Sequence, residues 1–365
     1  MEFIDLKQSY NKYKESIDLR MRKVLDNGTY IMGPEIVELE TSLKEYVRVK
    51  HCISVASGTD SLEIALRSFN IGMGDEVITV PFSWISTAEV IVQVGATPVF
   101  VDIEPDYYSL NHNLLEKAIT NKTKAIIPVS LFGQMPNLEE IIRIAEKYNI
   151  PVIEDAAQSF GATRHGKKSC SVCVISSTSF FPAKPLGCFG DGGALFTDDD
   201  EIANNIRAIR NHGGLVRHNH THIGMNGRMD TLQAAVILGK WHGFEEEVEA
   251  RIKIGARYSE ALKSFVDVPK ILDGNTHVYA QYTVRVESGK REFVIDFLKN
   301  RGIPTGVYYP KCFHEQPAFA FLKYNLGDFP ESEKASNEVL SLPMHPFLNV
   351  QEQDYIIESL IESLK

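Results

Sequence analysis

Short apolar runs rich in β-branched residues alternate with segments of helical periodicity through the first half of the chain. Parallel strands must be joined by crossovers, which are usually helices, so this alternation predicts a mostly parallel sheet with helices on both faces. The predicted strands span residues 51–56, 76–80, 98–102, 124–130, 151–154, 173–178 and 193–197. The predicted helices between them span residues 60–69, 85–94, 113–119 and 138–148.

The later part of the chain has a different pattern. The elements predicted there are a long charged helix over 231–263, a strand over 279–286, a helix near 291–300, a strand over 303–308 and a terminal helix. A chain of 365 residues is long enough for two domains. We expect a large α/β domain over 1–245 with a mixed, mostly parallel seven-stranded sheet, and a smaller α+β domain over 246–365.

Charge, hydropathy and cysteine content limit the range of partners. The net charge of −10 argues against nucleic acid or an anionic membrane as partner, although backbone amides can still hold a small phosphate group. No apolar run approaches the length of a membrane span. The five cysteines are scattered, and the polar first residues lack the apolar core of a secretory signal. We therefore expect the protein to stay in the cytoplasm.

Ser57, Gly58 and Thr59 follow a predicted strand and open a predicted helix. The first amides of a helix have no partner within it and attract anions, so this turn and the Thr59 hydroxyl can hold a phosphate group. The alternative is an ordinary helix cap, a role that Ser, Thr and Asp favour. Ligands of parallel sheets bind at the carboxyl ends of the strands, which is where this turn lies.

Asp155 ends another predicted strand and reaches the same edge of the sheet. A buried carboxylate there needs a cation or several hydrogen-bond donors, and a pyridinium nitrogen is one such cation. The alternative is a carboxylate that caps the segment that follows the strand.

Lys184 lies in an apolar, glycine-rich loop that no acidic residue precedes closely. Poor solvation lowers the pKa of a lysine amine and frees it for Schiff-base chemistry. Gly187 and Gly190 let the backbone bend closely around a ligand. A lysine exposed on the surface is the alternative.

Two further patterns resemble metal-binding tracts. Cys170 and Cys173 form a lone C-x-x-C, and residues 217–222 carry three histidines at alternate positions in a polar loop. Neither pattern provides a preformed set of ligands, so we predict no metal site. We expect the histidine loop to lie near a dimer interface and to contact substrate.

Four segments together resemble a known family. They are SGTDSL at 57–62, IEDAAQSFGA at 153–162, SFFPAKPLGCFGDGGALFT at 179–197 and IGMNGRMDTLQAAV at 223–236, and they are similar to the DegT/StrS group of nucleotide-sugar aminotransferases. The likeness covers nearly the whole chain. It implies the aspartate-aminotransferase-type fold (PLP fold type I), pyridoxal 5'-phosphate (PLP) as cofactor, and a homodimer.

Carried over by position, the resemblance implies a role for each matching residue. Lys184 would hold PLP as a Schiff base and later shuttle a proton, while Asp155 would bind the pyridine nitrogen and Gln158 the phenolic oxygen. The other implied contacts are Trp84 on the ring, Gly58, Thr59 and Ser179 on the phosphate, Asn226 reaching in from the partner subunit, and Arg228, Tyr308, Tyr309 and His314 near the sugar.

The resemblance also implies a reaction, the transfer of an amino group from L-glutamate to the C3 keto group of a nucleotide-linked sugar for surface glycans such as lipopolysaccharide. We expect a dTDP-linked 3-keto-6-deoxyhexose, because Cys312 and Phe313 replace a Pro-Leu pair common in the family and offer an apolar neighbourhood to a methyl group. A UDP-linked 3-keto-uronate is the alternative, with Arg228 as the cation for its carboxylate. A 4-keto sugar also stays open.

Two other functions compete with transamination. Relatives that dehydrate sugars carry His at the lysine position, so Lys184 favours transamination. A regulatory or binding role on the same fold is the alternative from another class, and the presence of Lys184, Asp155 and Gln158 argues against it.

Overall fold

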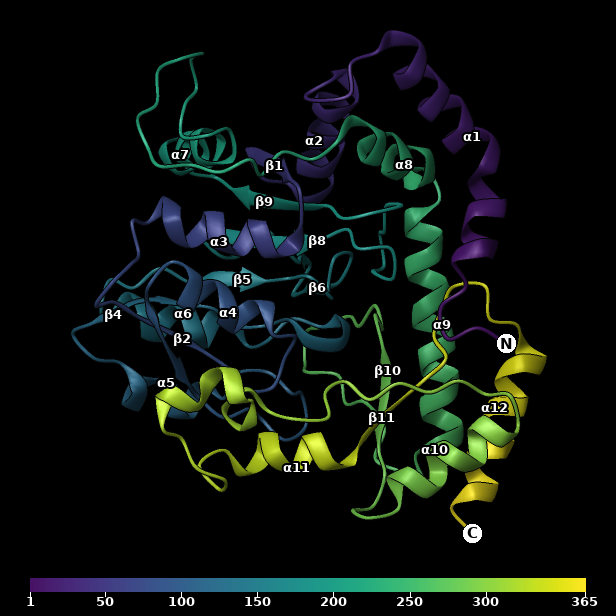
Figure 1. Cartoon of the computed structure of the whole chain (residues 1–365). Coiled ribbons are helices and arrows are strands. Elements are labelled where there is room, and N and C mark those ends of the chain that lie inside the picture. The colour runs from purple at the N-terminus through teal and green to yellow at the C-terminus, as the bar shows by residue number, and fades with distance from the viewer.

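The computed structural model describes the whole chain, residues 1–365. Figure 1 shows a layer of strands between helices and, beside it, a smaller group of elements around β10 and β11. The strands are β1 (His51–Val55), β2 (Glu76–Thr79), β3 (Thr97–Phe100), β4 (Thr123–Ile126), β5 (Ile153–Asp155), β6 (Thr163–Arg164), β7 (Lys167–Lys168), β8 (Ile175–Ser179), β9 (Gly193–Thr197), β10 (Tyr282–Arg285) and β11 (Val339–Leu342).

Helices surround both groups of strands. The α-helices are α1 (Leu6–Asn27), α2 (Pro34–Val47), α3 (Gly58–Ser68), α4 (Ser86–Gln93), α5 (His112–Ala118), α6 (Leu138–Glu146), α7 (Asp200–Arg210), α8 (Thr231–Trp241), α9 (Phe244–Leu262), α10 (Arg291–Asn300), α11 (Pro330–Glu338) and α12 (Val350–Ser363). Three short 3₁₀ helices are η1 (Leu131–Gly133), η2 (Phe313–Glu315) and η3 (Pro317–Leu322).

The large sheet has the strand order β3-β2-β4-β5-β8-β9-β1. A four-stranded unit, β1-β9-β8-β5, and a three-stranded unit, β3-β2-β4, are joined by parallel bridges from Ile126 to Val152 and from Val129 to Asp155. In this sheet β9 runs antiparallel to both neighbours, and the other pairs are parallel. The predicted α/β fold with a mixed, mostly parallel sheet is therefore confirmed.

The two faces of the sheet pack against separate hydrophobic cores. Every residue of β9 is buried. Leu195 packs into the core on the side of α3 and α7, while Phe196 packs into the core on the side of α1, α2 and α8. Neighbouring residues of a strand point to opposite faces, so burial on both faces explains why the strands read as continuous apolar runs.

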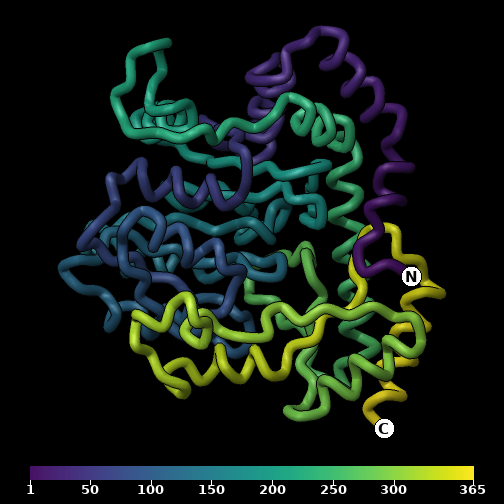
Figure 2. The backbone as a smooth tube through the Cα atoms, viewed as in Figure 1, coloured from purple at the N-terminus to yellow at the C-terminus, as the bar shows by residue number.

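The predicted helix over 231–263 is two helices, because α8 ends at Trp241 and α9 begins at Phe244. Gly243 between them has no room for a side chain, since a Cβ there would lie 2.1 Å from the hydroxyl oxygen of Tyr13. Tyr13 belongs to α1, which lies along α8 (Figure 2). The break between α8 and α9 thus lies where Tyr13, from a helix remote in the sequence, packs against Gly243.

The smaller group of elements forms a core of its own. β10 and β11 pair antiparallel, and they pack with α9, α10 and α12 around side chains such as Tyr258 and Leu360. The predicted strand over 303–308 is wrong, since only Gly306 forms a bridge, to Ser341 of β11. Pro304 lacks an N–H group, which limits pairing along this segment.

Residues 307–338 return from the smaller group to the edge of the large sheet. Phe313, Phe319 and Phe329 surround Phe100 of β3. The predicted boundary at residue 245 falls in the first turn of α9, and the division into domains over 1–245 and 246–365 stays a prediction.

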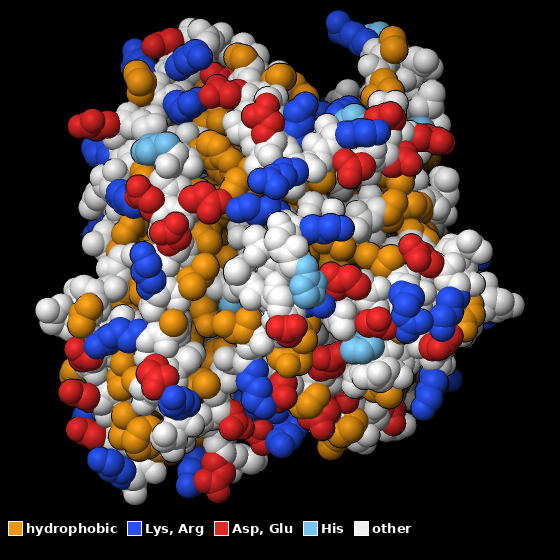
Figure 3. All heavy atoms as spheres, turned by 180° about the vertical axis from the view of Figure 1, so that it is seen from behind, with side chains coloured by type: hydrophobic (Ala, Val, Ile, Leu, Met, Phe, Trp, Pro, Cys, Tyr) orange, Lys and Arg blue, Asp and Glu red, His pale blue; other side chains and the backbone are white.

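No helix combines the length and the apolar character that crossing a membrane would need. On the face opposite to that of Figure 1, acidic and basic side chains are interspersed with apolar patches (Figure 3). Both signs of charge are therefore mixed on this face.

Candidate active site

The carboxyl ends of β1, β5 and β8 meet at one edge of the large sheet. β5 ends at Asp155, β8 ends at Ser179, and β1 leads through Ser57 into α3. Ser179 and Val55 pair with the same residue of β9, Gly193. The motifs singled out in the sequence, which are far apart in the chain, therefore converge here.

The turn before α3 packs tightly against the end of β8. A Cβ on Gly58 would lie 2.7 Å from the Cβ of Ser179, so this position requires glycine. The Thr59 hydroxyl lies 2.8 Å from that of Ser86, which begins α4. Hydroxyls from three segments thus surround the first amides of α3, and such a set of donors can bind a phosphate group. Ser86 was not predicted for this site.

The side chain of Lys184 is partly buried in the loop between β8 and β9. Burial lowers the pKa of its amine to about 8, against the opposing attraction of Asp155. Backbone bonds fix the loop, with the Lys184 N–H donating to Phe181 O and the Cys188 N–H to Phe180 O, each at 2.8 Å. Near neutral pH this lysine is neutral more often than an exposed one, and the neutral amine is the form that attacks carbonyl carbons.

Asp155 is buried and held by two donors. Its carboxylate accepts a hydrogen bond from the Thr87 hydroxyl at 2.7 Å and from the Ala157 N–H at 3.2 Å. Burial raises the pKa of Asp155, while these donors and the charge of Lys184 oppose the rise. A carboxylate in this setting suits a cationic partner such as a protonated pyridine nitrogen.

Thr87 contacts Asp155 but was not predicted for this site. It lies in α4, far from Asp155 in the chain, and it is a buried side chain with no motif around it. Its hydroxyl contact with Asp155 is visible only in the folded chain. The sequence feature that could have indicated Thr87 is a polar residue in the first turn of a helix that faces the sheet edge.

We expect Thr87→Val to slow turnover about tenfold, since the variant loses a hydrogen bond to a charged group. Without this donor the pKa of Asp155 rises further, so the acidic limb of the pH–rate profile moves to higher pH. The matched control is Thr79→Val, because Thr79 is equally buried and donates to Ile127 O at 2.8 Å. Equal effects of the two substitutions on rate and profile would contradict a role for Thr87 at Asp155.

Gln158 connects the sheet edge to the predicted sugar loop. Its amide oxygen accepts from the Phe132 N–H at 2.8 Å, and its amide nitrogen donates to the Tyr309 hydroxyl at 3.1 Å. Trp84 is 58% exposed, and its ring centroid lies 6.2 Å from that of Tyr309. Tyr308 packs against Tyr309 in turn, with ring centroids 5.8 Å apart. The structure thus brings Gln158, Trp84, Tyr308 and Tyr309 together.

The segment Asn226–Arg228 runs beside the start of α3, where Gly227 O accepts from the Ala56 N–H at 2.9 Å. Asn226 is exposed. Arg228 donates from Nη1 to Asn211 Oδ1 at 2.8 Å, and its Nε is buried without a partner. The roles predicted for Asn226 and Arg228 stay predictions.

His314 is anchored to α11. Its Nε2 lies 3.0 Å from Oε1 of Glu333, a carboxylate that also accepts from the Gly327 N–H. A contact between His314 and the sugar stays a prediction. Its neighbours Cys312 and Phe313 are buried in two apolar cores, so the argument that they line the sugar site has no support in the structure.

The histidine loop extends from the body of the molecule beyond α7 (Figure 1). His218, His220 and His222 are not buried there. No group of three or more His, Cys, Asp or Glu side chains in the chain is placed to hold a metal ion.

The residues at the sheet edge fit PLP. An aldehyde needs a neutral amine, which Lys184 offers, and a pyridine nitrogen needs a buried carboxylate, which Asp155 offers. A phosphate needs amides and hydroxyls; Ser57 Oγ caps the Asp60 N–H at 3.0 Å, which leaves the amides before Asp60 and the hydroxyls of Thr59 and Ser179.

Comparison with known sequences places the chain. The model of the DegT/DnrJ/EryC1/StrS aminotransferase family matches residues 11–361. The chain belongs to this family. Solved structures similar to it include one with bound PMP, the amino form of the cofactor, and one in the PLP form.

Three curated relatives cover almost the same length. UDP-2-acetamido-2-deoxy-3-oxo-D-glucuronate aminotransferase of Pseudomonas aeruginosa is 51% identical over 96% of both chains. The pleiotropic regulatory protein of Geobacillus stearothermophilus is 43% identical, over 98% of this chain and 97% of its own. The dTDP-3-amino-3,4,6-trideoxy-alpha-D-glucose transaminase of Streptomyces venezuelae is 35% identical, over 99% and 95%.

A solved structure confirms the fold. DesV from S. venezuelae superposes with a TM-score of 0.97 at 34% identity, over 100% of this chain and 98% of that chain. The predicted aspartate-aminotransferase-type fold, the PLP cofactor and the enzyme class are confirmed. This family member is a PLP-dependent aminotransferase of nucleotide-linked keto-sugars.

Proposed function

We propose that this aminotransferase moves the amino group of L-glutamate to the C3 keto group of a UDP-linked 3-keto-uronate. The relative at 51% identity is named for such a sugar, whereas the relative named for a dTDP-linked sugar is 35% identical. The expected preference for a dTDP-linked 3-keto-6-deoxyhexose is not confirmed, and the UDP-linked alternative takes its place.

The observation that carries the proposal is that Asp155 lies close enough to Lys184 to attract its amine. Asp155 is buried and Lys184 is partly buried at the carboxyl edge of the sheet, and the two groups attract each other. A lysine with a lowered pKa beside a buried carboxylate is the arrangement expected of an amine that forms a Schiff base and then transfers protons.

PLP, when bound, supplies a conjugated ring that accepts electrons from the carbon that loses its proton. We assign the movement of that proton to Nζ of Lys184, and the retention of the proton on the ring nitrogen to Asp155. Gln158 has one amide N–H engaged with Tyr309, which leaves its second N–H to donate to the phenolic oxygen. The contacts assigned to the rest of the site are Trp84 on the ring and Gly58, Thr59 and Ser179 on the phosphate.

Arg228 supports a uronate as substrate. A carboxylate that leaves water on binding needs a cation, because an unpaired buried charge is costly. Nη1 of Arg228 donates to Asn211 and its Nε is buried, so Nη2 is the guanidinium nitrogen left to bind a carboxylate. Tyr308, Tyr309 and His314 are the other residues that we assign to the sugar.

We expect the enzyme to prefer a UDP-linked 3-keto-uronate over a dTDP-linked 3-keto-6-deoxyhexose when both compete at equal concentration. Arg228→Ala should lower kcat/KM for the uronate about 100-fold, the loss expected for a charged hydrogen bond, and leave the deoxyhexose nearly unaffected. Arg67→Ala removes an ion pair within α3 and serves as the control. A higher kcat/KM for the deoxyhexose in the wild-type enzyme would overturn the substrate, and the mass and NMR spectrum of the product distinguish C3 from C4 amination.

A homodimer is part of the proposal. Trp84, Phe181 and Phe189 are 58%, 51% and 43% exposed in a single chain, and the last two flank the Lys184 loop. Large aromatic side chains that are this exposed favour cover by another surface. We propose that a second copy covers them and that its Asn226 reaches the cofactor phosphate.

A mixture of Lys184→Ala and Asn226→Ala chains tests the shared site. If each site takes residues from both subunits, one site of each mixed dimer keeps both residues and recovers activity that the parents lack. We expect up to about a quarter of the wild-type activity after random exchange, since half of the dimers are mixed and each has one good site. Activity no higher than that of the parents, after mass spectrometry has verified exchange and each parent has proved defective, would argue against the shared site.

A regulatory role is the second candidate, because a relative at 43% identity is named a pleiotropic regulatory protein. An enzyme consumes glutamate and releases 2-oxoglutarate with each turnover when its keto-sugar is present. A purified protein that binds PLP but turns over neither the UDP-linked nor the dTDP-linked 3-keto sugar would favour the regulatory role.

A further inference from the structure

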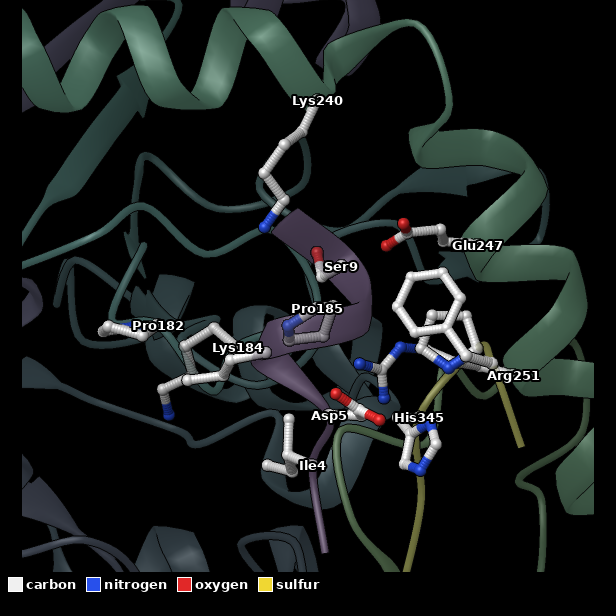
Figure 4. Close-up of a pocket in the computed structure, with 13 residues that line it drawn as sticks. Ile4, Asp5, Ser9, Pro182, Lys184, Pro185, Lys240, Glu247, Arg251 and His345 are labelled. Carbon is white, nitrogen blue, oxygen red and sulfur yellow. The ribbon is translucent and has the colours of Figure 1, made fainter. Parts of the chain in front are cut away.

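Charged side chains that the proposed reaction does not use lie beside the Lys184 loop. They line a cavity of about 20 Å³ together with Pro182, Lys184 and Pro185. Figure 4 shows the amine of Lys184 extending away from Arg251 and Asp5. The ionisable groups of this cavity come from the N-terminal segment, α8, α9 and the segment before α12, and they are Asp5, Lys240, Glu247, Arg251 and His345.

Lys240 makes the direct contact with the loop. It lies in the last turn of α8, is 7% exposed, and donates from Nζ to Gly187 O at 2.7 Å. Gly187 itself leaves no space, because a Cβ there would lie 2.4 Å from Pro182 O. The carbonyl that Lys240 holds thus belongs to the tight turn that follows Lys184.

A buried ammonium group needs compensation, and Glu247 is the carboxylate that attracts it. Around the cavity, Glu247 Oε1, Arg251 Nε and His345 Nδ1 are buried without a hydrogen-bond partner. A cavity of about 20 Å³ has room for one water molecule, which would satisfy such atoms. These side chains therefore form a buried polar cluster. Its one side-chain hydrogen bond to the lysine loop comes from Lys240.

We propose that Lys240 is a positioning residue for Lys184: by holding Gly187 O it keeps the lysine loop closed and the Lys184 amine away from water. The inference rests on the proposed function, in which Lys184 is the reacting amine. Glu247 attracts the charge of Lys240 and Arg251 repels it, whereas Asp155 is the group that acts on Lys184.

The test measures Lys184 in the enzyme stripped of cofactor, and so does not depend on turnover. Lys240→Met removes the donor at nearly constant volume, and Lys240→Gln keeps a polar group that is too short to reach Gly187 O. An amine-reactive reagent labels Lys184 at a series of pH values, and mass spectrometry of the lysine-loop peptide gives the rate. Both variants should open the loop to water and move the midpoint of the labelling profile about one pH unit upward, toward that of an exposed lysine.

Lys168→Met is the matched control, because Lys168 is a partly buried lysine that donates to Tyr46 and Glu245 and does not contact the loop. It should lower the melting temperature without changing the Lys184 profile. Unchanged profiles in both folded Lys240 variants, or an equal shift in the control, would overturn the inference. A wild-type enzyme that shows the profile of a buried lysine but aminates no keto-sugar would instead overturn the proposed function.

Discussion

Lys184→Ala should lower steady-state turnover roughly 10⁴-fold or more, because the substitution removes both the covalent link to PLP and the base that moves the proton. The variant should still bind PLP without a covalent bond, since Gly58, Thr59 and Ser179, the residues proposed to hold the phosphate, lie apart from the lysine. The measurements are the initial rate with glutamate and keto-sugar, and the PLP that stays with the protein after gel filtration.

Lys168→Ala controls for the loss of any partly buried lysine, and it should leave the rate close to that of the wild type. A Lys184→Ala enzyme with easily measured steady-state turnover would remove Lys184 from the mechanism. Loss of PLP binding together with turnover would show that the phosphate contacts alone do not hold the cofactor.

Asp155→Asn should slow turnover about 100- to 1,000-fold while the fold stays intact, in the range measured when one preorganised electrostatic group is removed from an active site. Asparagine has nearly the same shape but no charge, so it cannot favour a protonated ring nitrogen. The effect should fall on kcat more than on KM for the sugar, because the ring nitrogen acts in the chemical step.

The control for Asp155→Asn is a substitution at an aspartate that only caps a helix. Asp199 accepts from the Glu201 and Ile202 N–H groups at the start of α7, and asparagine caps helices equally well. Asp199→Asn should therefore keep full activity. If Asp155→Asn were just as mild, Asp155 would be a cap, which is the alternative that its position in the sequence left open.

The residues that could be predicted from the sequence are those whose local pattern already determines their place. Asp155 and Ser179 end buried strands, and the carboxyl ends of neighbouring strands must meet. Lys184 follows in a glycine-rich loop with little room for solvent. The hydrophobic periodicity and the turn residues place the strand ends and the loop. The convergence of Asp155, Ser179 and Lys184 therefore follows from the fold class alone.

The remaining features depend on contacts between distant segments, which no local pattern encodes. Thr87 reaches Asp155, and Tyr13 lies against the break between α8 and α9, only because separate helices pack there. Cys312 and Phe313 seemed available to a sugar from their position in a loop, but they are buried in cores formed with the large sheet. The expectation of a dTDP-linked sugar rested on these two residues and is not confirmed, and the name of a relative at 51% identity fits the UDP-linked alternative better.

Transamination of a nucleotide-linked keto-sugar is tested most simply by the visible absorption of the lysine-linked cofactor. Glutamate added to the wild-type enzyme should bleach the band, because the amino group passes to the cofactor. A UDP-linked 3-keto-uronate added next should restore the band and yield the 3-amino sugar, detected by mass. A band that glutamate leaves unchanged, or one that glutamate bleaches and no nucleotide-linked keto-sugar restores, would contradict the account.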